Sequence, residues 1–223
     1  MSPSRPRGET AARDGGAANT PRRRGRPRKD ARPPGSPTTK DLILRAAADA
    51  FASRGFDGSS LVDIASAAGV TTGAVYSHFS GKPELLLDVV SSTLDAVDPR
   101  SRAESEVTPG YLHEWLAWLL APAQHKLRAL IAEIHHAAAR NPEVRALLAD
   151  YSTQYARMIA AMIRRWRDEG LVRADLGASG TAELFLVDAL GACVSTALRP
   201  ELASNRRFIG LLDRRVTDLL GEV

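Results

Sequence analysis

Residues 60–82 read SLVDIASAAGVTTGAVYSHFSGK, and this stretch predicts two short helices joined by a tight turn. Ser60 can cap the first helix through its hydroxyl, with Asp63 at the third helical position as a capping-box acid. Gly69 stands where that helix must end in a left-handed residue, and Thr71 can cap the second helix. Such a pair is a helix-turn-helix, whose second helix enters the major groove of DNA.

The side chains of the second helix divide between an inner and an outer face. Val70 and Val75 are predicted to point back into the core. The positions left for the groove and the phosphates are Thr71, Thr72, Ala74, Tyr76 and His78. A structural helical hairpin is the alternative interpretation, but such a hairpin needs neither a Thr-Thr-Gly start nor an exposed rim of Tyr, His and Lys. The pattern therefore favours DNA binding.

The composition limits where the protein works. Of its 223 residues 44% are hydrophobic, which is enough to build a core. There is no run of about 18 apolar residues and no apolar stretch after the basic N-terminus, so neither a membrane span nor a signal peptide is expected. Cys193 is the only cysteine, which fits a reducing cytoplasm. We interpret it as a core residue, with a redox sensor as the alternative.

Positive charge is concentrated at the N-terminus. Residues 1–40 contain eleven Lys/Arg and three acidic residues, a net charge of +8, whereas residues 41–223 contain 19 basic and 23 acidic residues. Residues 1–37 are also poor in large apolar side chains, so this basic arm is predicted to be disordered. Its charge indicates a polyanionic partner at this end of the chain.

Helical periodicity runs through nearly all of residues 38–221, without strand-type alternation of useful length or a heptad seam sustained over several turns. We predict an all-α protein with a DNA-binding domain and connecting helix at 38–97 and a regulatory and dimerisation domain at 98–223. Residues 98–110 are rich in helix breakers and are predicted to form a loop. Outside the helix-turn-helix, helices are predicted from Thr38 or Thr39 to Gly55 and near 82–96, 111–121, 123–140, 142–169, 178–198 and 202–221.

A set of residues at 38–90 is shared with a known family. The set consists of Phe51, Gly55, Phe56, Ile64, Ala65, Ala68, Gly69, Val70, Gly73, Tyr76, His78, Phe79, Lys82 and Leu85. Together these residues resemble the tetracycline-repressor (TetR/AcrR-like) family of bacterial transcription factors. The resemblance implies an all-helical homodimer, with three N-terminal helices on DNA and a C-terminal domain for ligand sensing and dimerisation. Beyond residue 90 the chain is similar to the family mainly in helix number and length.

The resemblance also implies roles for single residues. Positions 72–74 and Tyr76 fall where family members approach base edges, and Lys82 falls where they grip phosphates. Because Lys82 begins the connecting helix, its amine and the helix dipole can share one phosphate. His78 has an alternative role as a polar cap over the hairpin. The predicted DNA-binding residues of the head are Ser60, Thr71, Thr72, Gly73, Ala74, Tyr76, His78 and Lys82.

The recognition helix is poor in residues that read bases directly. It has no Arg, Asn or Gln for a bidentate contact with a base. We therefore expect methyl contacts from Thr72, Ala74 and Val62 to thymines, together with DNA shape, to carry much of the specificity.

The basic arm contains a short motif that resembles an AT-hook. Arg24 and Arg26 flank Gly25 and precede Pro27. Gly25 lets the backbone approach the groove floor, Pro27 keeps the chain extended, and the arginines can enter a narrow A·T minor groove. The alternative is a solvated tail that adds only nonspecific attraction. Both interpretations predict a steep dependence of DNA affinity on salt.

The helices predicted between residues 111 and 169 carry most of the chain's large aromatic side chains. Trp115 and Trp118 are three residues apart and so share a helix face. The predicted ligand pocket consists of Trp115, Trp118, His136, Tyr151, Tyr155 and Met158. These residues suit a hydrophobic or aromatic effector, with an ordinary core as the alternative. His135 and His136 are adjacent and point to different faces, so no metal site or cofactor is predicted.

The two last helices, at 178–198 and 202–221, have wide apolar faces with small residues that permit close approach. We predict that they form a four-helix interface with a second copy, although they could instead complete the monomer core. The leading function is a repressor that binds a palindromic operator. An effector would release the repressor from DNA by favouring a conformation in which the two heads are not spaced for successive major grooves. The helix at 82–96 is the expected coupling element.

Two other classes of function are alternatives to the repressor. An architectural, nucleoid-type protein would use the basic arm on A·T-rich minor grooves and coat DNA uniformly. An enzyme is not expected, because no Ser/His/Asp, Cys/His, paired-carboxylate or phosphate-loop arrangement appears at usable spacing.

Overall fold

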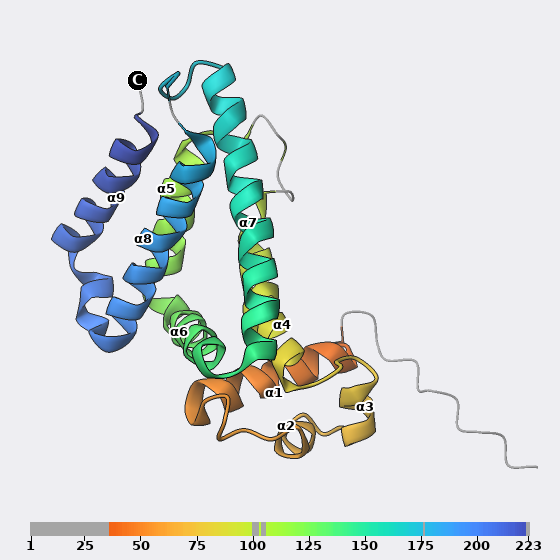
Figure 1. Ribbon diagram of the computed structural model, residues 1–223. Coiled ribbons are helices and arrows are strands. Elements are labelled where there is room, and N and C mark those ends of the chain that lie inside the picture. The colour runs from red at the N-terminus through yellow and green to blue at the C-terminus, as the bar shows by residue number, and fades with distance from the viewer. Residues whose placement is uncertain (1–35, 100–102, 104–105, 176, 222–223) are drawn as a thin grey trace, which may run out of the picture. The chain divides into compact units, whose positions relative to one another are not determined.

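The computed structural model describes residues 36–99, 103, 106–175 and 177–221. Most of the basic arm, with Arg24 and Arg26, lies outside the described residues. Pro37–Val223 form one compact unit, in which the helix-turn-helix packs against the first helix, and the first helix packs against α4 (Lys82–Leu94) and α6 (His125–Arg140) (Figure 1). Every regular element in the described part of the chain is a helix, which confirms the predicted all-α class.

The head contains three helices: α1 (Thr39–Arg54), α2 (Leu61–Ala67) and α3 (Thr72–Tyr76). A capping box begins α1, since the Thr38 hydroxyl accepts the Asp41 N–H at 3.1 Å and the Asp41 carboxylate accepts the Thr38 N–H at 2.7 Å. The bonds to Thr38 hold the pKa of Asp41 below its usual range. The helix ends at Gly55 with φ 71°, as predicted.

The turn between α2 and α3 follows the predicted chemistry. Gly69 has φ 67°, and the N–H of Val70 donates to the carbonyl of Ala65 at 3.0 Å, a Schellman closure of α2. The Thr71 hydroxyl then accepts the N–H of Ala74 at 3.1 Å and caps α3. A left-handed glycine and a hydroxyl cap thus set the angle between the two helices.

Ser60 caps α2 as predicted, but the capping box is only half formed. Its hydroxyl accepts the Asp63 N–H at 3.1 Å. The Asp63 carboxylate accepts from the same hydroxyl at 2.7 Å and not from a backbone N–H. The Ser60 side chain therefore caps α2, and the Asp63 carboxylate holds the Ser60 hydroxyl in place.

The other helices are α4 (Lys82–Leu94), η1 (Asp95–Val97), α5 (Gly110–Leu120), η4 (Pro122–Gln124), α6 (His125–Arg140), α7 (Pro142–Asp168), α8 (Ala178–Leu198), η5 (Pro200–Ser204) and α9 (Arg206–Leu220). Their bounds lie within two residues of the prediction, except at the start of α9. The predicted start at residue 202 is wrong. Pro200 opens a separate 3₁₀ turn, and the Asn205 side chain then caps α9 by accepting the N–H groups of Arg207 and Phe208.

One cluster of buried side chains runs from the head into the body. Trp166 is fully buried, and its indole N–H donates to the carbonyl of Val107 at 2.7 Å, which ties the segment before α5 to α7. Arg128 is also buried, and its guanidinium donates to the carbonyls of Leu119 and Ala121 at 2.8 Å each. These carbonyls end α5, where the helix dipole is negative, so the cation closes that helix.

Candidate DNA-binding face and ligand cavity

One side chain anchors the recognition helix α3 in the core of the head, and the others are exposed to solvent in full or in part. Val75 is fully buried, whereas Tyr76 is 58% exposed and Val62 of α2 is 63% exposed. Of the other predicted positions, Ser60, Thr71, Gly73 and His78 are exposed, and Thr72 and Ala74 are half-buried. The face that the sequence assigns to DNA is therefore accessible. Contact with DNA by these residues stays a prediction.

Lys82 is engaged inside the head. Its Nζ donates to the carbonyl oxygens of Phe56 at 2.6 Å and Ser59 at 3.0 Å, and it lies 4.3 Å from the centroid of the Phe56 ring. These contacts tie the start of α4 to the turn between α1 and α2. Two of the three ammonium donors are thus used within the protein. A phosphate contact by Lys82 stays a prediction, and its structural role was missed by sequence reasoning.

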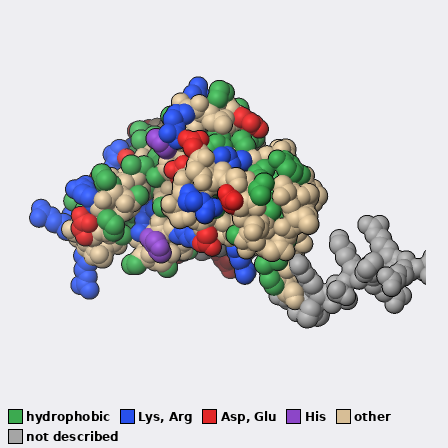
Figure 2. All heavy atoms as spheres, turned by 90° about the horizontal axis from the view of Figure 1, so that it is seen from below, with side chains coloured by type: hydrophobic (Ala, Val, Ile, Leu, Met, Phe, Trp, Pro, Cys, Tyr) green, Lys and Arg blue, Asp and Glu red, His purple; other side chains and the backbone are tan. Residues whose placement is uncertain are grey.

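The helix-turn-helix carries little positive charge of its own. Residues 60–81 contain no Lys or Arg, and Lys40 of α1 is paired with Asp88 of α4 at 2.8 Å. The hydrogen bond to Asp88 raises the pKa of Lys40. Figure 2, seen from the side on which α1–α3 lie, shows basic, acidic and hydrophobic side chains interspersed. Attraction to the phosphate backbone must therefore come largely from elsewhere in the chain.

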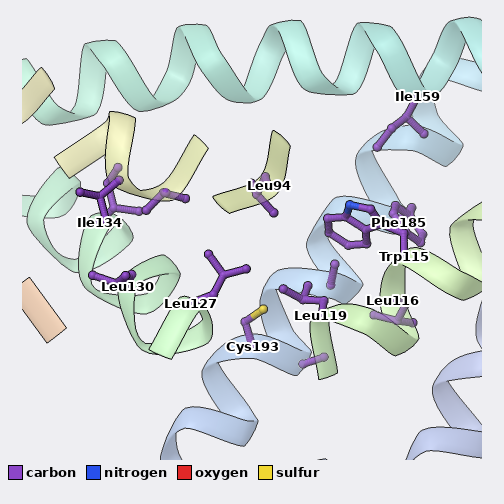
Figure 3. Packing of buried hydrophobic residues seen from close by; sticks show 14 of the residues in the cluster. Leu94, Trp115, Leu116, Leu119, Leu127, Leu130, Ile134, Ile159, Phe185 and Cys193 are labelled. Atoms are coloured by element: carbon purple, nitrogen blue, oxygen red, sulfur yellow. The ribbon is translucent and has the colours of Figure 1, made fainter. Parts of the chain in front are cut away.

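A cavity of about 240 Å³ lies in the body between α4 and α8. Its lining is mainly apolar and consists of Val90, Leu94, Trp115, Leu119, Ile131, Ile134, His135, Leu148, Tyr151, Ser152, Tyr155, Glu183, Leu186, Val187, Ala189, Leu190 and Cys193. Figure 3 shows Leu94, Ile134, Trp115 and Cys193, which come from four helices around this interior. The cavity is large enough for a small apolar molecule.

Three of the six predicted pocket residues line this cavity: Trp115, Tyr151 and Tyr155. Their rings form an aromatic wall, with centroids 6.3 Å apart for Trp115 and Tyr155 and 5.9 Å apart for Tyr151 and Tyr155. Phe185 extends the wall behind Trp115, at 5.5 Å. Burial raises the pKa of Tyr155, so its phenol stays neutral.

The other three predicted pocket residues lie elsewhere. His136 is exposed, and its neighbour His135 lines the cavity, because adjacent helical residues point about 100° apart. Trp118 is half-buried against the core outside the cavity lining. Met158 lines a second hollow of about 250 Å³, which shares Leu94, Tyr151 and Tyr155 with the first.

Two polar groups of the lining have defined surroundings. The His135 Nδ1 lies 2.7 Å from the carbonyl oxygen of Ile131, one turn earlier on α6. Burial raises the pKa of the Cys193 thiol to about 12, so it is protonated at neutral pH. Cys193 therefore belongs to the buried core, as interpreted from the sequence, and also forms part of the cavity wall.

One face of α8 exposes large apolar side chains at a regular spacing. Leu184, Val187, Val194 and Leu198 are 48%, 62%, 46% and 79% exposed, and Gly191 lies between them. Intervals of three and four residues place all five on one stripe, which we call the α8 stripe. The sequence predicted an apolar face on this helix but no sustained heptad seam, because α8 also carries apolar residues such as Phe185 and Cys193 on its other faces.

By length and composition alone, α8 would pass as a membrane-spanning helix, with 39% of its apolar window buried inside the structure. A core helix of a soluble protein passes the same test. Here the face opposite the α8 stripe packs against α6 and α7. The apolar character of α8 is thus explained by a core on one side and by the α8 stripe on the other.

The arrangement described so far defines a helix-turn-helix DNA-binding protein with a helical, cavity-containing body. Comparison with known proteins agrees, since residues 43–89 match the profile described as bacterial regulatory proteins, tetR family. Residues 43–89 therefore form a DNA-binding domain of the TetR type, and the curated proteins that match the chain are DNA-binding transcriptional regulators.

Individual relatives match different lengths of the chain. The transcriptional regulator TtgR of Pseudomonas putida is 46% identical over 74 residues, which cover 32% of this chain but only 35% of TtgR. The transcriptional repressor AcnR of Corynebacterium efficiens is 26% identical over 138 residues, or 62% of this chain and 71% of AcnR. The structure of Salmonella enterica GusR is 27% identical with a TM-score of 0.67, covering 82% of this chain and 95% of GusR.

Proposed function

We propose that the protein is a cytoplasmic, homodimeric transcriptional repressor that binds a palindromic operator and is released by a small, largely apolar effector. The observation that carries this proposal is the path of α4. The helix begins at Lys82, against the turn between α1 and α2, and its side chains Val90 and Leu94 line the cavity. One helix therefore connects the DNA-binding head to the candidate effector site.

The α8 stripe supports a dimer. Four large apolar side chains on one helix face lose their contact with water when a second copy covers them, which is favourable by about 25 cal/mol per Å² of apolar surface. Gly191 at the centre allows two helices to approach closely. Two-fold symmetry then presents two recognition helices, as a palindromic site requires.

The lining of the cavity supports an apolar effector. Aliphatic and aromatic side chains dominate it, and its few polar groups are a histidine, a serine, two phenols, a thiol and one carboxylate. The name of AcnR supports repression rather than activation. An effector that prefers a wrong separation of the two heads would lower operator affinity by shifting the population of dimers.

Selection of bound duplexes from a random library by the purified full-length protein tests the proposal. We expect one palindromic sequence with a discrete footprint, and loss of that footprint in Tyr76→Ala. Uniform coating of A·T-rich DNA would instead support the architectural alternative. A panel of apolar aromatic compounds, followed by quenching of tryptophan fluorescence and release of the selected operator, then tests the cavity.

A further inference from the structure

The backbone of Phe56, in the turn between α1 and α2, is held from two sides. Its N–H donates to the Glu133 carboxylate of α6 at 2.6 Å, and its carbonyl accepts from Lys82 of α4 at 2.6 Å. The Phe56 ring is buried, 6.2 Å from the ring of Phe51, with the Lys82 ammonium over it. This one peptide segment therefore joins the head to α4 and α6 at once.

Glu133 belongs to a line of contacts along α6. Lys126, Glu133 and Arg140 are seven residues apart and share one face, since two helical turns take about 7.2 residues. Lys126 pairs with Asp49, and Arg140 pairs with Asp57 at 2.8 Å. Both ion pairs join exposed side chains, where such pairs contribute little. Only the Glu133 contact is partly buried and reaches the main chain.

The opposite face of α6 lines the cavity. Ile131 and Ile134 are cavity residues, and Ile131 is two positions from Glu133, which places it about 200° around the helix. On the other wall, α4 contributes Leu94 to the same cavity. Two of the five helices that line the cavity, α4 and α6, thus also hold the carbonyl and the N–H of Phe56.

We propose that Glu133 is the positioning residue that transmits occupancy of the cavity to the DNA-binding head, through the N–H of Phe56. This inference rests on the proposed effector response. A molecule that separates α6 from α4 must lengthen one of the two bonds to Phe56 or rotate the turn between α1 and α2. Because α2 and α3 follow this turn, the spacing of the two recognition helices in the dimer changes.

Substitutions that fill the cavity can stand in for the unidentified effector. Ala189 of α8 and Leu148 of α7 both line it, so Ala189→Phe and Leu148→Trp fill it from different helices. Each is combined with Glu133→Ala in the full-length dimer, and affinity for the selected operator is measured. We expect filling to weaken operator binding about tenfold in the presence of Glu133 and less than about threefold in Glu133→Ala.

Two further variants separate transmission from a merely structural role. Glu133→Gln keeps an oxygen that accepts the Phe56 N–H, so it should restore the response to filling. Arg140→Ala removes a contact from the same face of α6 and should leave the response unchanged. Amide hydrogen exchange of the segment containing Phe56 should accelerate on filling in the wild-type background.

Two results would overturn the proposal. One is an equal loss of operator affinity on filling with and without Glu133, and the other is no loss from either filling substitution in a dimer that melts cooperatively. Failure of the proposed function would look different from these two results. If the protein is not an operator-binding repressor, the unsubstituted protein selects no discrete operator at all.

Discussion

The head and the body of this protein differ in what determines them. The bounds of α1–α3 follow from single residues with fixed local roles, among them the caps Thr38 and Thr71 and the left-handed Gly69. The cavity depends instead on which side chains several helices bring together, and the exposure of the α8 stripe depends on which face of α8 the other helices leave uncovered. The head must fit the geometry of the DNA groove, a constraint that does not apply to the body.

The two regions are nevertheless one compact unit. The contacts of the head with α4 and α6 include the ion pair between Lys40 of α1 and Asp88, and the hydrogen bond between Glu133 and Phe56 in the turn after α1. These contacts are the physical link through which the proposed effector response would reach the head.

The largest expected effect comes from the body. Val194→Glu places a charge in the α8 stripe and should convert the dimer to a monomer, because a carboxylate cannot be buried there without a partner. Operator affinity should then fall on the order of 10²–10⁴-fold, since the two heads no longer bind together. Sedimentation and fluorescence anisotropy measure the two effects. Thr153→Glu, at an exposed position of α7, is the matched control, and a dimer that survives Val194→Glu would place the interface elsewhere.

The second-largest effect is expected from the basic arm, because the helix-turn-helix itself carries little positive charge. Removing residues 1–36 should make the slope of log affinity against log salt shallower by about 0.9 for each phosphate released. With about three arm contacts, the intact protein loses roughly 40-fold more affinity than the truncated one between 50 and 200 mM salt. Replacing Arg24 and Arg26 by Ala in the full chain tests the AT-hook itself. An unchanged slope after truncation would remove the arm from DNA binding.

A smaller effect is expected from the exposed face of α3. Tyr76→Ala should weaken operator binding by about 1–3 kcal/mol, or roughly 5- to 150-fold, without lowering the melting temperature. Lys82→Met is the informative contrast, because it leaves the carbonyls of Phe56 and Ser59 without their donor. It should lower both stability and affinity. Normal operator binding by Tyr76→Ala would show that the DNA face is wrongly assigned.

The smallest effect tests the turn alone. Gly69→Ala should destabilise the fold by about 1–2 kcal/mol, because a Cβ is disfavoured at φ 67° even though open space surrounds it. Gly180→Ala, in α8 with equally open surroundings and no positive φ, should stabilise the protein by up to about 1 kcal/mol. Denaturant unfolding measures both changes. Equal effects at the two positions would mean that conformation at Gly69 does not limit stability.

Much of the candidate site was predictable because its signals are local. Turn glycines and hydroxyl caps act within four residues, so the sequence alone placed α2, α3 and the exposed Tyr76. Trp115 and Tyr155 were assigned to the pocket from spacing on their own helices. The position of His135 in the cavity could have been inferred from its spacing to Ile131, four residues earlier.

The amino-acid sequence determined the helical class, the helix-turn-helix and the basic arm, because periodicity, caps and charge are properties of short stretches. Only the tertiary structure decided that Lys82 bonds to the carbonyl of Phe56, that Glu133 reaches its N–H, and that His136 lies outside the cavity. These outcomes join residues up to 77 positions apart. They depend on how whole helices pack, which no local pattern encodes.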